Sequence, residues 1–252
     1  MRIHLEIDAK KWSADLSQPL DISIPIQAGL ANPNCFYAPL VVFSPVIAGD
    51  FIGSTAKGGP VNFLTIQLNP HGTGTHTECV GHIADSSYTI NQSLGEFHFV
   101  AKLVSLYPMR QENGDRMIER SQMEAVLAAG TGVEALIIRT LPNGDWKRGH
   151  SYSGTNPPYI HEAAMSYIVE CGIQHLLVDI PSVDREEDGG DLLAHRAFWV
   201  YPDNVRKNCT ITELIYVDDK IKDGIFLLNL QIASFEIDVS PSKPILYQLV
   251  VS

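Results

Sequence analysis

The chain has 252 residues, of which 45% are hydrophobic and 19% charged, so it can bury a large core, and we expect one domain over residues 1–252. Its net charge of -11 argues against nucleic acid as a partner, because phosphate-backbone binding needs clustered Lys and Arg. No stretch approaches the roughly 18 apolar residues of a membrane span, and the N-terminus lacks a signal-peptide core, so we expect a cytoplasmic protein with no membrane partner.

Short β-like runs recur along the chain, with two helices between them. The predicted strands cover residues 21–26, 61–69, 98–106, 135–140, 175–180, 224–232 and 244–250. Several are apolar on consecutive residues, which indicates strands covered on both faces. A capping-box pattern at Ser121-Gln-Met-Glu124 opens a helix that ends at Gly130, and residues 161–171 have helical spacing before Gly172. Because each helix precedes a buried strand, the pattern predicts an α/β domain with a mixed sheet and few helices.

Residues 71–82 read HGTGTHTECVGH and hold three of the nine histidines together with a glutamate. A helix is unfavourable here, because it would place His76 and Glu78 about 200° apart and each glycine would cost it roughly 1 kcal/mol. In an extended chain the side chains repeat every two residues, so His76, Glu78 and His82 project from one side. We therefore predict that this segment binds an ion.

In an extended chain, His71 would project from the opposite side to His76, Glu78 and His82. The chain must therefore turn at the glycines for His71 to reach the same ion. Gly72 and Gly74 can take positive φ and turn the chain, which brings the His71 imidazole back towards the others. Imidazole and carboxylate ligands suit zinc, manganese or ferrous iron, whereas calcium and magnesium sites use oxygen ligands. The predicted cofactor is a divalent metal, zinc or manganese, present as one or two ions.

The cysteines offer little to such a site. Cys35, Cys79, Cys171 and Cys209 are scattered and form no CxxC pair, so neither a disulfide framework nor a thiolate zinc knuckle is indicated. Cys79 follows Glu78 directly, so in an extended chain its side chain should point away from the predicted ion site and pack elsewhere. An alternative enzyme hypothesis makes Cys79 a nucleophile with His82, three residues away, as its base.

Gly74-Thr-His-Thr-Glu-Cys-Val-Gly-His82 resembles the GTHxDxPxH signature of the metal-dependent cyclase and bacterial kynurenine formamidase superfamily. Residues 178–199 (VDIPSVDREEDGGDLLAHRAFW) and 209–217 (CTITELIYV) are similar to two later family segments, and residues 15–20 and 224–231 match in character. The likeness covers most of the chain. It implies a compact cyclase-like fold of the swivelling β/β/α type, acting on a small-molecule substrate and assembled as a homodimer or homotetramer.

The resemblance also implies roles for individual residues. His76 matches the family's second histidine ligand, Glu78 stands where a carboxylate bridges the metals, and His82 matches the histidine that ends the signature. His195 and Glu213 fall where the family supplies a histidine and a glutamate to a second metal. The gap between these last two residues is longer than in the formamidases.

The signature itself departs from the family pattern. Gly72 occupies the position of the first histidine, so the candidate ligand His71 lies five residues before His76 instead of four. Glu78 replaces an aspartate and Val80 a proline. Glutamate is longer by one methylene, about 1.5 Å, so an added residue in the preceding turn could compensate. These departures leave the number of metals and the substrate open.

The implied reaction is hydrolysis of a non-peptide carbon–nitrogen bond, in an N-formyl aryl amine or a cyclic amide. A divalent metal supports this by activating water and polarising a carbonyl. His82 is the predicted catalytic acid or base, because an imidazole titrates near neutral pH, although it could equally be a ligand or an orienting residue. A competing hypothesis is a non-catalytic metal or small-molecule binding protein on the same scaffold.

Residues outside the cluster receive mostly structural interpretations. The acidic run 184–191 is typical of a solvated loop. Three residues near it follow a buried strand and either form local turns or face the site: Asp179, Ser182 and Asp184. Five aromatic residues could line a pocket but are more often core: Trp12, Phe36, Tyr37, Trp199 and Tyr201. The histidines at 4, 98, 150, 161 and 175 are interpreted as ordinary hydrogen-bonded residues.

Overall fold

In the computed structural model, which describes residues 1–85 and 88–251, seven strands close into a barrel. The order is β16-β9-β12-β14-β15-β8-β17, and pairing of β17 with β16 completes the ring, while β3 adds to β17 outside it. The bounds are β3 Leu20–Asp21, β8 His76–Glu78, β9 His98–Leu106, β12 Ala135–Thr140, β14 His175–Val178, β15 Thr210–Glu213, β16 Gly224–Ile232 and β17 Val239–Gln248. The predicted α/β class with a mixed sheet is confirmed.

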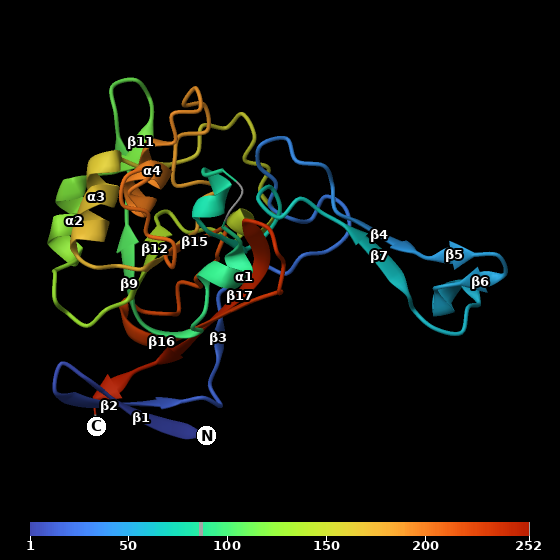
Figure 1. Cartoon of the computed structure of the whole chain (residues 1–252), viewed down its shortest axis with the longest axis horizontal. Helices are drawn as coiled ribbons and strands as arrows, with labels where there is room; N and C mark the ends of the chain where they lie inside the picture. The colour runs from blue at the N-terminus through green and yellow to red at the C-terminus, as the bar shows by residue number, and fades with distance from the viewer. Residues whose placement is uncertain (86–87, 252) are drawn as a thin grey trace.

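Three helices cover one outer side of this barrel (Figure 1). They are α2 Arg120–Val126, α3 Glu162–Glu170 and α4 Leu193–Trp199, and they precede the parallel strands β12, β14 and β15. In β12, Leu136 and Ile138 belong to the cluster under the helices, whereas Ala135 and Ile137 belong to a second cluster with residues of β9 and β16. Burial of both faces explains the continuous apolar run of this strand.

Most predicted strands exist, and three have the predicted bounds: 98–106, 135–140 and 224–232. The predicted strand 175–180 ends at Val178, and the predicted strand 244–250 lies largely within the longer β17. The strand predicted over 21–26 is wrong beyond Asp21. Pro25 has no N–H, and the Ile24 N–H donates to Thr75 Oγ1 instead of to a strand backbone.

Both predicted helices are present with changed ends. The first begins at Arg120 and ends at Val126, and its capping box uses Glu119 and Gln122 in place of Ser121 and Glu124. The second is α3, whose N-cap His161 accepts a hydrogen bond from the Ala163 N–H. The sequence analysis did not predict α4 or the short α1 Ile90–Ser93. Among the described residues, no helix combines the length and apolarity needed to cross a membrane.

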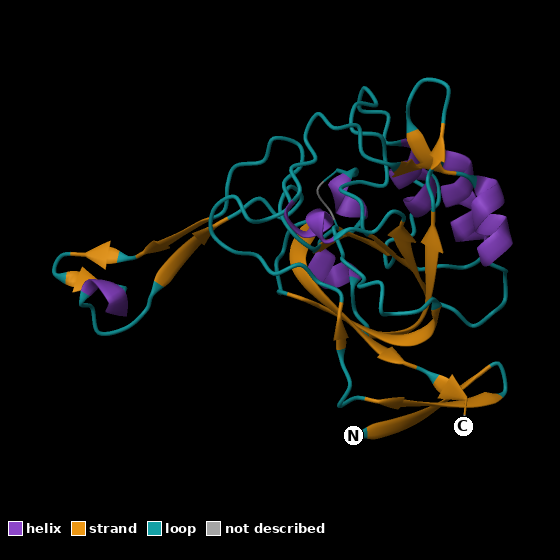
Figure 2. Ribbon diagram, turned by 180° about the vertical axis from the view of Figure 1, so that it is seen from behind, coloured by secondary structure: helices purple, strands orange, loops and turns teal. Residues whose placement is uncertain are grey.

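Three smaller strand groups extend from the barrel (Figures 1 and 2). One comprises β1 Arg2–Ile7, β2 Lys10–Asp15 and β18 Val250–Val251, and another β10 Met109–Arg110, β11 Arg116–Ile118 and β13 Tyr159–Ile160. The third is a long hairpin, residues 42–67, called the arm below. It comprises β4 Val42–Pro45, β5 Ile47–Ala48, β6 Phe51–Ile52, η1 Thr55–Lys57 and β7 Leu64–Gln67. The strand predicted over 61–69 is therefore shorter and fully exposed.

Candidate metal centre

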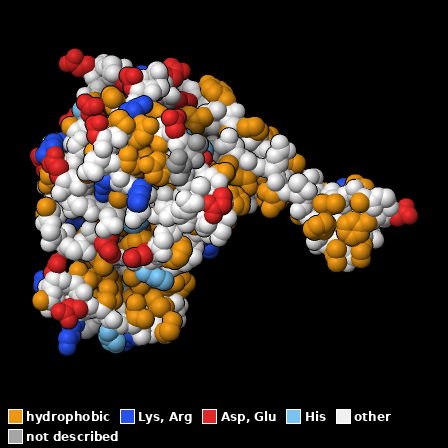
Figure 3. Space-filling model, in the orientation of Figure 1, with side chains coloured by type: hydrophobic (Ala, Val, Ile, Leu, Met, Phe, Trp, Pro, Cys, Tyr) orange, Lys and Arg blue, Asp and Glu red, His pale blue; other side chains and the backbone are white. Residues whose placement is uncertain are grey.

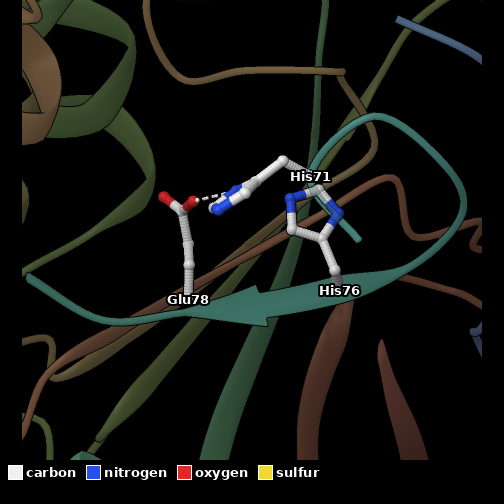
Figure 4. A group of neighbouring side chains, drawn as sticks. All are labelled: His71, His76 and Glu78. Atoms are coloured by element: carbon white, nitrogen blue, oxygen red, sulfur yellow. Dashed lines mark ion pairs between the residues drawn. The ribbon is translucent and has the colours of Figure 1, made fainter. Parts of the chain in front are cut away.

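Strand β8 lies in the barrel wall between β15 and β17 and carries the first two members of the centre. His76 and Glu78 project from the same side of the strand, as the two-residue period predicts (Figure 4). Thr77 hydrogen-bonds with Thr212 of β15 through their hydroxyls, at 2.8 Å. All three residues are buried, so the barrel wall fixes the directions of the two site residues.

The turn before β8 brings His71 back to Glu78, whose Oε2 lies 3.1 Å from His71 Nδ1 (Figure 4). Gly74 has a φ of +75°, which supports the predicted role of this glycine in turning the chain. Gly72 was expected to act in the same way, but its φ is not positive. A Cβ at Gly72 would lie 2.2 Å from the Ala38 Cβ, so this position needs a glycine for space.

The second side of the centre comes from distant segments. Helix α4 places His195 Nε2 3.0 Å from Glu78 Oε1. Glu213, at the end of β15, directly opposes His76 across the antiparallel pair, and their Oε2 and Nε2 atoms are 3.4 Å apart. His82, in the short helix η2 Val80–His82, lies with Nδ1 3.9 Å from Glu78 Oε2. The structure thus brings all six predicted site residues together.

The Glu78 carboxylate divides the centre into two overlapping donor sets. In one, ligand atoms of His71, His76 and Glu78 all lie within 4.8 Å of one another. In the other, Glu78, His82 and His195 meet the same limit. Glu78 Oε2 faces His71 and His82, and Oε1 faces His195, so this carboxylate lies between the imidazoles of the two sets.

His76 offers the most specific sign of an ion site. Its Nδ1 lies 3.0 Å from the Gly74 carbonyl, so the Nδ1–H group donates to that oxygen and Nε2 remains for another partner. This Nε2 is buried and makes no hydrogen bond to any described residue, although Glu213 is close. Buried polar atoms normally have partners. A buried imidazole nitrogen beside a carboxylate offers the kind of donor pair that suits a divalent cation.

The electrostatics of the cluster favour positive charge. Burial alone would raise the pKa of the Glu78 carboxyl, but the charge of His82 and hydrogen bonds from His195 and His71 hold that pKa well below its ordinary value. Burial alone would lower the pKa of His71, but hydrogen bonds to Asp238 and Glu78 raise it to about 10. A bound cation would be stabilised by these same carboxylates, in competition with protons.

Two further carboxylates complete the surroundings. Asp184 Oδ2 lies 2.5 Å from His195 Nδ1, and its oxygens accept the N–H groups of Ala194 and His195 at the start of α4. Asp238, just before β17, places Oδ2 2.7 Å from His71 Nε2 and 3.5 Å from His82 Nδ1. The sequence analysis left Asp184 open between site and turn and did not identify Asp238.

The remaining interpretations of single residues have mixed outcomes. The run 184–191 is largely a solvent-exposed loop, as predicted, except for the buried Asp184. Asp179 is buried in a structural ion pair with Lys147, 2.8 Å away. Trp199 is buried and stacks on the His195 ring, whereas Phe36 and Tyr37 are exposed and do not belong to the core.

Comparison with known proteins supports the fold and shows the family. Residues 14–185 match the sequence model of the family described as putative cyclase. The kynurenine formamidase of Bacillus anthracis is 23% identical over 238 residues, which cover 94% of this chain and 97% of that protein. Isatin hydrolase A from Ralstonia solanacearum superposes with a TM-score of 0.66 at 15% identity over 92% of each chain. An isatin hydrolase bound to the product analogue thioisatinate superposes with a TM-score of 0.61 at 18% identity over 93% of each chain. Because the family match spans more than half of its length, this chain belongs to the cyclase family.

Proposed function

We propose that this protein is a metal-dependent hydrolase of a non-peptide carbon–nitrogen bond in a small molecule, an N-formyl aryl amine or a cyclic amide. The observation that carries the proposal is the Glu78 carboxylate between two imidazole groups, beside the unpartnered buried Nε2 of His76. The names of the similar proteins support the substrate class, since kynurenine formamidase acts on a formamide and isatin is a cyclic amide.

The donor chemistry assigns the ligands. His71, His76 and Glu78 would hold one ion, and Glu78 and His195 would hold a second. We assign Glu213, whose Oε1 lies 4.0 Å from His195 Nε2, to the second ion in place of His82, which leaves His82 for proton transfer. These nitrogen and oxygen donors suit zinc or manganese. Such an ion, when bound, lowers the pKa of a water molecule and polarises a carbonyl group.

His82 is the proposed proton carrier. Its side chain is 29% exposed at the edge of the cluster, whereas the other signature histidine, His76, is buried. The Asp238 carboxylate beside His82 Nδ1 favours a proton on that atom, which makes Nε2 the atom that exchanges protons. In this role His82 accepts a proton from the attacking water and returns it to the leaving nitrogen.

The structure disfavours the thiol alternative. The Cys79 side chain is fully buried in a core cluster with Ile22, Ile90 and Leu94, as its parity predicted. Burial raises the pKa of this thiol, whereas a nucleophilic cysteine needs a lowered pKa. The departure at Gly72 also has a substitute in the structure. Gly72 lacks the imidazole expected at its position, but His71 places Nδ1 3.1 Å from Glu78 Oε2 and can supply that ligand. This contact weakens the argument for a non-catalytic binding protein.

Elemental analysis combined with a substrate panel tests the proposal. Purified protein should contain one or two equivalents of zinc or manganese, and it should hydrolyse N-formyl anilines or isatin-like lactams in a chelator-sensitive way. His76→Ala should lose metal and turnover, while His98→Ala, at an exposed histidine bonded to Asn229, should keep both. Turnover that survives exhaustive chelation, or a metal-loaded protein inert to the whole panel, would contradict the proposal.

A further inference from the structure

A cavity of about 320 Å³ lies at the end of the barrel where the parallel strands begin. Its lining includes Phe99, the second residue of β9, and His175, the first residue of β14. The metal centre lies at the other end of these strands, since Glu213 is the last residue of β15. None of the six residues of the centre lines the cavity. Small-molecule sites have volumes of roughly 300–1,000 Å³, so this cavity is a separate space of sufficient size for a ligand.

His175 gives the cavity a buried hydrogen-bonding group. The residue is 3% exposed, and its Nδ1 lies 2.8 Å from the Thr210 hydroxyl oxygen. Among the described residues Thr210 is the hydrogen-bond partner of this ring, so Nε2 remains for a molecule in the cavity. Burial lowers the pKa of the imidazole to about 4, so the ring is uncharged at neutral pH. An uncharged imidazole favours a ligand without charge.

The other polar side chains of the lining are three carboxamides and one carboxylate: Gln92, Gln174, Asn208 and Glu96. A carboxamide both donates and accepts, so it pairs with a planar ring that has an amino group beside a ring nitrogen, as Asn and Gln do with adenine. A carboxylate only accepts, so Glu96 favours an amino group over a carbonyl group on the ligand. The lining therefore suits an aminated heterocycle.

Charge disfavours a phosphorylated ligand. Among the described residues that line the cavity, none is Lys or Arg, and the chain has a net charge of -11. On the face of the body seen in Figure 3, basic side chains are interspersed with acidic ones and form no broad basic surface. Phosphate groups are bound mainly by Arg and Lys. Leu94 and Phe99 supply apolar contact instead, which suits the flat face of an uncharged ring.

We propose that this cavity is a second ligand site, separate from the metal centre, for an uncharged planar heterocycle that carries an amino group, such as an aminopurine or aminopyrimidine nucleoside. In this site His175 Nε2 and the carboxamides of Gln174 and Asn208 pair with the edge of the ring. Glu96 accepts a hydrogen bond from the amino group.

Calorimetric titration of the full-length, metal-loaded protein tests the ligand class. The probes are adenosine and cytidine, which carry the amino group, and inosine and uridine, which carry a carbonyl group in its place. At least one amino nucleoside should bind about tenfold or more tighter than its carbonyl counterpart, because a carbonyl oxygen would face the Glu96 carboxylate. Adenosine monophosphate should bind more weakly than adenosine.

Two variants at exposed positions locate the site. Asn208→Leu should weaken binding about tenfold, whereas Lys207→Leu, at a neighbouring residue outside the lining, should bind like the wild type. Gly95→Trp should block the cavity, and a Cβ at Gly95 meets no atom within 4 Å, so the fold can accept this change. Circular dichroism of all three variants should match that of the wild type.

Hydrogen exchange gives a readout that needs no variant. The bound nucleoside should protect amides at the starts of β9 and β14 and leave those of β8 unchanged. Failure of both amino nucleosides to bind, equal binding of the carbonyl nucleosides, or tighter binding of the monophosphate would overturn the proposal. So would unchanged binding by both Asn208→Leu and Gly95→Trp. Binding that disappears on chelation or in His76→Ala would place the nucleoside at the metal centre and would also overturn it. These measurements do not depend on hydrolase activity, so the two proposals can fail separately.

Discussion

Glu213 and His76 are direct cross-strand partners in the β15–β8 pair, and their Oε2 and Nε2 atoms lie 3.4 Å apart. Both side chains are buried, and both strands belong to the closed barrel, so the spacing of these donors is set by backbone pairing. The barrel wall therefore holds this part of the centre, and helix α4 supplies His195.

Glu213→Gln should keep the shape of this pair and remove its charge. We expect metal affinity to fall by about 100-fold or more, because an amide is a weaker ligand than a carboxylate. Competition with a chromogenic chelator measures the change. Glu170→Gln, at a surface ion pair with Arg120, is the control and should bind metal like the wild type. Equal affinities for all three proteins would remove Glu213 from the ligand set.

Asp184→Asn should weaken metal binding without unfolding α4. Asparagine has one acceptor oxygen, which can still accept the Ala194 N–H, but it no longer accepts from His195 at the second position or holds that ring by charge. Loss of such an orienting carboxylate typically costs about 10–100-fold in metal affinity. The same change at the exposed Asp191 should have no effect, and a similar loss there would mean that only overall charge matters.

His82→Ala should lower kcat by about 10²–10⁴-fold, because it removes the proposed proton carrier. Asp238→Asn should cause a smaller loss, on the order of tenfold, through misorientation of His82. For both variants we expect KM to change little and the metal content to stay at the wild-type value. A variant that loses its metal would instead identify the replaced residue as a ligand.

Cys79→Ala should keep full activity and lose roughly 1 kcal/mol of unfolding free energy, because a buried sulfur is removed from a packed cluster. Iodoacetamide should modify the partly exposed Cys171 in native protein and leave turnover unchanged. Mass spectrometry locates the label. Inactivation that tracks labelling of Cys79 would revive the thiol mechanism.

His175 should make folding stability depend on pH. Burial, with a smaller contribution from Arg206, lowers the pKa of its imidazole from 6.5 to about 4. Between these two pKa values the unfolded chain binds more protons than the folded one. The contribution of His175 to the free energy of unfolding is therefore fully present above pH 6.5 and is lost as the pH falls towards 4. It amounts to at most about 3 kcal/mol. Urea unfolding measures the free energy of unfolding at each pH. Its dependence on pH over this range should be weaker for His175→Gln than for the wild type, whereas His98→Gln, at an exposed histidine, should behave like the wild type.

The local sequence pattern was sufficient to predict structure where the repeat of side chains along a strand or helix decides it. The two-residue repeat placed His76 and Glu78 on one side of an extended segment, and β8 confirms this. Largely apolar runs located β9, β12 and β16 at their observed bounds, and β12 is buried at every position. Capping signals located α2 and α3 to within a few residues. The capping box of α2 was predicted two residues too late, at Ser121 and Glu124 instead of Glu119 and Gln122.

Local pattern could not supply partners from distant parts of the chain. His195 and Glu213 were found by family resemblance, and the centre needs the pairing of β8 with β15 and the position of α4 to join them. Asp238 enters only because β17 pairs with β8 in a register that sets it beside His71.

Burial is the other property that only the tertiary structure decided. Residues 61–69 have the apolar pattern of a core strand, yet β7 is fully exposed on the arm. The sequence by itself determined the donor types, the extended geometry of the signature and the strand-rich α/β class, because these follow from side-chain chemistry and local backbone preference. The order of the barrel strands and the closure of the barrel depend on contacts between segments far apart in sequence, so the fold alone set them.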